Sequence, residues 1–95
     1  MTTYVSLVNW TEQGMRNSQQ TINRAEEFTK LVENSGGSVR EVLWTLGDYD
    51  SLAIVDFPDD ETAVATLLQG KGQIRTHTMR AFGTDEMSGI VRKAT

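Results

Sequence analysis

The stretch SVREVLWTLGDYDSLAIVDFPDDETA, residues 38–63, decides the fold. Residues 38–46 and 51–57 are rich in β-branched, aliphatic and aromatic side chains, which is typical of strands. The residues between them, Gly47 to Asp50, form a turn, because glycine accepts a positive φ and aspartate bonds to nearby backbone. Two strands joined so closely form an antiparallel hairpin. The acidic run after Pro58 begins a helix with Asp59 as its N-cap.

The segments on either side of this stretch predict two more strands and a long helix. Residues 3–9 and 73–82 have the composition and partial alternation of strands. Apolar residues recur at helical spacing between residues 18 and 35, and the glycines at 36–37 stop that helix. Its cap is Asn17 or Ser18, and its apolar residues are Ile22, Ala25, Phe28, Leu31 and Val32.

Three shorter segments complete the assignment. Residues 10–20, WTEQGMRNSQQ, are expected to form a polar loop. The helix that starts at Asp59 is expected to end at Gly70 and Gly72. Thr84 is expected to cap a short final helix. The apolar side of that helix would consist of Met87, Ile90 and Val91.

The order of these elements is β-α-β-β-α-β, which predicts an α+β, ferredoxin-like domain over residues 1–95. Such a domain has a four-stranded antiparallel sheet of order 4-1-3-2, with both helices on one face. A sheet covered on one face should alternate apolar and polar residues. Residues 52–55 and 42–44 are instead consecutively apolar. We therefore expect a homodimer in which two sheets pack face to face, as in a dimeric α/β barrel.

Composition excludes several classes of function. The 95 residues carry a net charge of −4 and no basic block, which argues against nucleic-acid binding. There is no cysteine, so there is no disulfide framework and no thiolate chemistry. No secretion signal and no 18-residue apolar run are found, so we expect a cytoplasmic protein without a membrane partner.

The predicted topology brings several loops to one edge of the sheet. These are residues 9–11, the turn at 47–50 and the loop at 70–72, while Arg80 and Phe82 lie at the opposite end. Near that first edge, Trp10, Trp44 and Tyr49 are candidate ligand-binding residues. The alternative for the two tryptophans is a structural role in the core or at a dimer interface, where large aromatic side chains are common. Tyr49 would either pack on a neighbouring subunit or face a ligand, and Asp50 would either shape the turn or act as a base.

The predicted fourth strand carries the only histidine, His77, and Arg75 on the same face. Histidine can act as a general base near neutral pH, and arginine can hold an anion. Both residue types also occur in surface ion pairs and interfaces. One histidine makes no metal site by itself, and no phosphate loop is present. We therefore expect neither a metal nor a cofactor.

The assembled residues resemble the GYD-domain family of small bacterial and archaeal proteins. The resemblance rests on three segments, LVNWTEQG, WTLGDYDSLAIVDFPDDETA and GQIRTHTMRAF. Gly47, Tyr49 and Asp50 match the glycine-tyrosine-aspartate signature, with Asp48 between them. The resemblance implies a ferredoxin-like fold related in architecture to dimeric α/β-barrel proteins, which include small monooxygenases, isomerases and dyp-type peroxidases. It implies no particular chemistry, because fold does not fix function.

The sequence is compatible with three functions. The first is a dimeric protein that binds a small hydrophobic or aromatic molecule beside Trp10, Trp44 and Tyr49. The second is a cofactor-independent enzyme, monooxygenase- or isomerase-like. In it, His77 or Asp50 would accept a proton, and Arg75 or Tyr49 would stabilise an oxyanion. The third is a protein-interaction or regulatory module.

Overall fold

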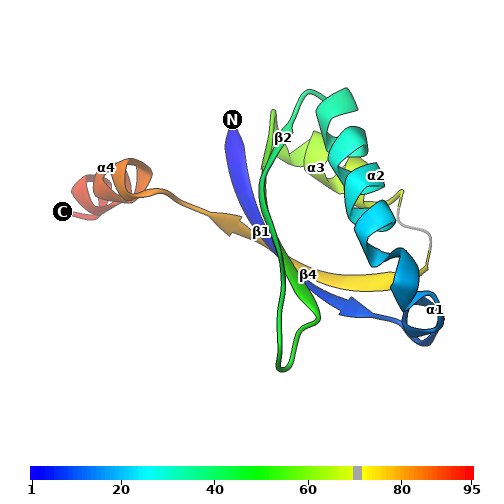
Figure 1. Ribbon diagram of the computed structural model, residues 1–95. Helices are drawn as coiled ribbons and strands as arrows, with labels where there is room; N and C mark the ends of the chain where they lie inside the picture. Colours follow the sequence, from blue (N-terminus) through cyan, green and yellow to red (C-terminus); the bar gives the residue numbers. More distant parts are fainter. Residues whose placement is uncertain (70–71) are drawn as a thin grey trace.

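A computed structural model describes residues 1–69 and 72–95 of the chain (Figure 1). Its sheet has the order β2-β3-β1-β4, and each neighbouring pair of strands is antiparallel. This order confirms the ferredoxin-like arrangement predicted from the sequence. The loop expected at 70–72 falls largely on Gly70 and Lys71, which lie outside the described residues. The elements of the β-α-β-β-α-β core are β1 (Thr2–Trp10), α2 (Thr21–Asn34), β2 (Ser38–Trp44), β3 (Ser51–Phe57), α3 (Asp60–Leu67) and β4 (Ile74–Ala81).

The segment between β1 and α2 differs from the expected loop. It contains a short helix, α1 (Glu12–Arg16), and a 3-10 turn, η1 (Ser18–Gln20). Thr11 caps α1, since its side chain accepts a hydrogen bond of 3.2 Å from the amide of Gly14. Gly14 lies so close to the backbone of Gln73 that an added Cβ would meet its carbonyl oxygen at 2.0 Å. The helix is therefore held by a cap and a close backbone approach, not by an apolar face.

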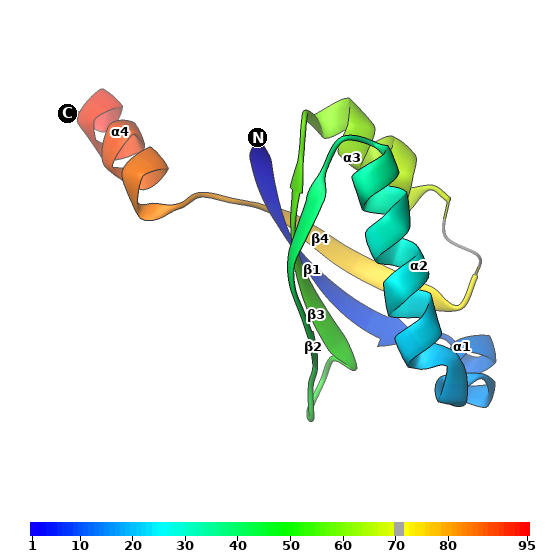
Figure 2. The same ribbon diagram turned by 45° about the horizontal axis from the view of Figure 1, so that its top comes forward.

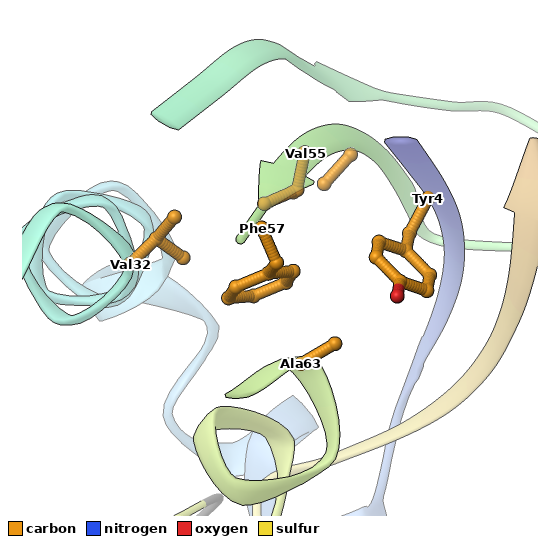
Figure 3. Packing of buried hydrophobic residues seen from close by; sticks show 6 residues of the cluster. Tyr4, Val32, Val55, Phe57 and Ala63 are labelled. Atoms are coloured by element: carbon orange, nitrogen blue, oxygen red, sulfur yellow. The ribbon is translucent and has the colours of Figure 1, made fainter. Parts of the chain in front are cut away.

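Helices α2 and α3 cover one face of the sheet in both views (Figures 1 and 2). The expected cap of α3 is confirmed, because Asp59 Oδ1 accepts the amide of Thr62 at 2.7 Å. Figure 3 shows the buried core, which lies between this face and the two helices. Its members are Tyr4, Val32, Ala53, Val55, Phe57 and Ala63.

Tyr4 joins this core to α3. Its ring meets that of Phe57 edge to face, with 5.7 Å between centroids. Its hydroxyl donates a hydrogen bond to the carboxylate of Asp60. Burial, followed by the hydrogen bond and charge of Asp60, raises the pKa of Tyr4 to about 12.

The other face of the sheet, called the open face below, has no helix among the described residues packed across it (Figure 2). Alternation along the strands places six apolar side chains there. Leu43 and Met79 are 49% and 48% exposed. The sheet is thus apolar on both sides, as its sequence predicts. The six residues are Val5, Leu7, Leu43, Leu52, Ile54 and Met79.

The final helix, α4 (Thr84–Ala94), extends away from the sheet on the side opposite α2 and α3 (Figure 1). It begins after Gly83, whose amide donates to Glu86 Oε1 at 3.2 Å, so Gly83 is the N-cap in place of Thr84. No residue of α4 is buried, and its apolar side is exposed. The extended helix gives the chain a radius of gyration of 14.5 Å, against about 12 Å for a compact domain of this length.

One carboxylate at the edge of the open face is almost fully buried. Asp56 is 7% exposed, and its Oδ2 accepts a hydrogen bond of 2.6 Å from Arg40 Nε. The hydroxyl of Thr3 donates to its other oxygen. Burial alone would raise the pKa of Asp56, but these hydrogen bonds and the charge of Arg40 outweigh burial and hold the pKa below its usual value.

A lowered pKa in the folded state stabilises the fold above the usual carboxyl pKa of about 3.9, and this contribution is lost as the pH falls through the folded value. We expect Asp56→Asn to lower the free energy of unfolding at neutral pH by about 1–3 kcal/mol. The difference from wild type should shrink as the pH falls from about 3.9, where the carboxyl of the unfolded chain titrates, through the lower pKa of the folded state, below which the wild-type carboxyl is neutral in both states. Urea unfolding across this pH range measures both effects. A difference that does not change with pH would contradict the assignment.

Candidate functional site

The turn between β2 and β3 is tied to the end of β1 by Asp50. Its amide donates to the carbonyl of Val8 at 2.8 Å, and its Oδ2 accepts the amide of Trp10 at 2.8 Å. The carbonyl of Asp50 also accepts the amide of Thr45 at 2.9 Å, which closes the hairpin. Gly47 has a φ of +138°, a conformation that favours glycine. The Asp50 carboxylate therefore extends the pairing of β1 with β3.

Tyr49 and His77 meet on the open face. Their rings pack edge to face, with 5.9 Å between centroids and 79° between planes. Arg75 lies two residues before His77 on β4, so alternation places it on the same face. None of these three side chains lines the cavity that borders Trp10 and Trp44, on the other face of the sheet.

Trp10 and Trp44 lie on the helix-covered face, where both line a cavity of about 110 Å³. The indole Nε1 of Trp44 donates to Thr21 Oγ1 at 2.9 Å and so bridges β2 to the start of α2. The candidate residues thus separate into two groups on opposite faces of the sheet, and Asp50 lies in the turn before β3, bonded to the backbone of β1. The cavity is lined by Ser6, Val8, Trp10, Thr21, Arg24, Ala25, Phe28, Val42, Trp44, Ser51, Ala53, Leu67, Ile74 and Thr76.

The cavity occupies the end of the sheet that the buried core leaves unfilled. The core lies against the last turns of α2, at Val32, whereas the cavity lies under its first turns. Among the described residues, Ala53 belongs to the buried core and lines the cavity, and Phe28 and Val42 line the cavity and pack against the core. A second hollow of about 390 Å³ adjoins the cavity and extends toward α3. Both hollows are lined by Arg24, Phe28, Leu67, Ile74 and Thr76.

Arg24 is a site residue that the sequence analysis missed. Its Nη1 donates to the carbonyl of Asn17 at 2.9 Å and to Gln73 Oε1 at 2.7 Å. Its Nη2 is buried and has no hydrogen-bond partner among the described residues. The spacing Arg24–Phe28–Leu31 could have indicated this position, because residues i, i+4 and i+7 share one helix face.

The described residues contain no group of three or more histidine, aspartate or glutamate side chains placed to hold a metal ion. Within residues 1–69 and 72–95, no helix has both the length and the apolar character needed to cross a membrane.

Fold and cavity together define a class: a small ferredoxin-like α+β domain with a hollow between its sheet and its first long helix. The GYD domain family model matches residues 4–91, and the chain belongs to this family. It is also similar to the crystal structure of TTHA0845 from Thermus thermophilus, with 25% identity and a TM-score of 0.53. That similarity covers 88% of this chain and 96% of the other. No curated protein matches the sequence.

The role of Asp50 can be measured with two substitutions in the same turn. We expect Asp50→Ala to lower the free energy of unfolding by about 1–3 kcal/mol, because the amide of Trp10 loses its acceptor. Asp48→Ala, at an exposed position of the turn, should change it by less than about 0.5 kcal/mol. Urea denaturation followed by circular dichroism gives both values. Equal effects of the two substitutions would show that the Asp50 carboxylate does not hold the turn.

Proposed function

We propose that this protein binds a small apolar or aromatic molecule in the cavity between its sheet and α2. The observation that carries the proposal is that both tryptophans of the chain line this one cavity. Indole rings offer large apolar surfaces to a planar ligand, and small-molecule sites are mostly apolar with a few placed polar groups. Here the polar groups are the hydroxyls of serine and threonine and one arginine.

The size of the cavity limits the ligand. A dry apolar cavity of about 150 Å³ holds a benzene molecule. The 110 Å³ here suits a ring or a short chain, and the adjoining hollow of 390 Å³ gives room for the rest of a longer molecule. The ligand would lie against Trp10 and Trp44 at one end and reach Phe28 and Leu67 at the other.

An enzyme without a cofactor is the second candidate, and the contact between Tyr49 and His77 is the observation that favours it. Arg75 lies on the same face as this contact. The carboxylate of Asp50 already accepts the amide of Trp10, so it is engaged in holding the turn. None of these four residues lines either hollow next to α2. Ligand binding is therefore better supported than proton transfer by His77 or Asp50.

Binding can be tested with N-phenyl-1-naphthylamine, a neutral aromatic dye whose fluorescence rises in an apolar site. We expect wild-type protein to bind the dye, and Ala25→Leu to weaken binding at least about tenfold, because the larger side chain fills the cavity. Ala65→Leu makes the same change at an exposed position of α3 and serves as the control. Circular dichroism checks the fold of each variant. Absence of dye binding to wild type, or equal binding by both variants, would contradict the proposal.

We further propose that two copies associate through their open faces, as in a dimeric α/β barrel. The six apolar side chains of the open face support this, because exposed apolar patches commonly mark interaction sites. In such a dimer Tyr49, His77 and Arg75 would lie at or beside the interface. A second copy would cover the apolar residues that no described element of the same chain covers.

Sedimentation velocity tests the dimer. We expect wild-type protein to sediment at twice the chain mass of 10.6 kDa, and Leu43→Glu to shift it toward monomer by placing a charge on the open face. Leu46→Glu introduces the same charge on a fully exposed side chain beyond the end of β2 and should leave the dimer intact. A monomeric wild type would contradict the dimer and favour the alternative of a module whose open face binds another protein.

A further inference from the structure

We infer that the ligand of the cavity carries a carboxylate and that Arg24 binds it. This inference rests on the proposed binding function and adds the chemical class of the ligand: a small carboxylate with an aromatic or short aliphatic body. The observation behind it is a guanidinium group that lines the cavity and is only partly hydrogen-bonded.

The two ends of the guanidinium differ in their surroundings. Nη1 donates hydrogen bonds to two uncharged acceptors, the carbonyl of Asn17 and the side-chain oxygen of Gln73. Nη2 lies out of reach of bulk water and has no acceptor among the described residues. A buried donor without an acceptor costs free energy, and the cost is larger for a charged group. An acceptor that enters with the ligand would remove this cost.

The charge of Arg24 is also uncompensated within the described structure. Among the described residues, Arg16, Arg40 and Arg80 each have an acidic partner within 4.0 Å, and Arg24 has none. Of the residues that the structure describes, Arg24 is the only charged one that lines the cavity. Glu27 lines the adjoining hollow, but its side chain is exposed to solvent. The site therefore combines apolar walls with one positive charge.

This combination selects one kind of molecule. A neutral hydrocarbon would fill the apolar walls and leave the guanidinium unsatisfied. A carboxylate with an apolar body would satisfy both, because arginine binds carboxylates through paired, charge-assisted hydrogen bonds. The hydrogen bonds of Nη1 fix the guanidinium beside the cavity, so the ligand would meet a positioned group.

Benzoate and benzamide test the inference, since they share size and shape but differ in charge. Both tryptophans line the cavity, so intrinsic tryptophan fluorescence reports binding of either probe. We expect wild-type protein to bind benzoate about tenfold or more tightly than benzamide. Arg24→Met should lower benzoate affinity far more than benzamide affinity and so abolish the preference for benzoate, because the loss of a positive charge costs an anion more than a neutral amide.

Two further variants complete the design. Arg75→Met removes the same charge from the open face and should preserve the preference for benzoate, which controls for the net charge of the protein. Arg24→Lys keeps the charge but loses the paired donors, and it should retain part of the preference. Arg24→Lys also keeps the test decisive if Arg24→Met does not fold, as judged by circular dichroism.

The outcomes separate this inference from the function on which it depends. Equal binding of the two probes to wild type would overturn the carboxylate assignment and leave the apolar binding site standing. A preference for benzoate that survives in Arg24→Met would show that another group holds the anion. If wild type binds neither benzoate, benzamide nor the neutral dye, both the function and the inference fail.

Discussion

The structure depends on a close approach between the end of α2 and strand β3. Gly37 follows α2, and an added Cβ there would meet the carbonyl oxygen of Asp56 at 2.4 Å and a methyl group of Val32 at 2.9 Å. Only glycine permits this approach, and it presses the last turn of the helix against Phe57. The sheet and the helix are thus fixed at one end, where Val32 and Phe57 are buried from water. At the other end the first turns of the same helix, with Phe28, lie over the two tryptophans of the sheet, and a cavity remains.

The two faces of the sheet separate the polar chemistry of the molecule. The helix-covered face holds the cavity with its single arginine, and the open face holds Tyr49, His77 and the ion pair of Arg40 with Asp56. Successive residues of one strand therefore lie in different surroundings, because their side chains alternate between the two faces. Thr76 and His77 are neighbours in sequence, yet one lines the cavity and the other contacts Tyr49. Asp50, at the edge, belongs to neither group because its carboxylate completes the pairing of β1 with the hairpin.

The hairpin, the strand order and the cap of α3 could be predicted because each depends on local chemistry. Composition marks the strands, Gly47 permits the turn and Asp59 caps the helix. Helix α1 could not be predicted from periodicity, because it is held by Thr11 and by contact with Gln73, which is distant in sequence. The family signature includes Tyr49 and Asp50, but no sequence pattern shows that Tyr49 packs on the face opposite the tryptophans or that Asp50 binds the backbone of Trp10. Arg24 was missed because an arginine on a helix usually extends into solvent. Its partners Asn17 and Gln73 become neighbours only in the folded chain.

The confinement of the core to one end of the sheet has a consequence for how such a protein can evolve. Substitutions at Val32 or Phe57 act on the residues that keep the chain folded, and most changes there reduce stability. Substitutions along the cavity walls reach fewer of these contacts, because Ala53 is the only described member of the buried cluster that lines the cavity, and of the other lining residues Phe28 and Val42 pack against that cluster. A lineage can therefore exchange the residues around the cavity, and with them its shape and polarity, without falling below the stability threshold that natural proteins must maintain. The fold separates what must be preserved from what is free to diversify.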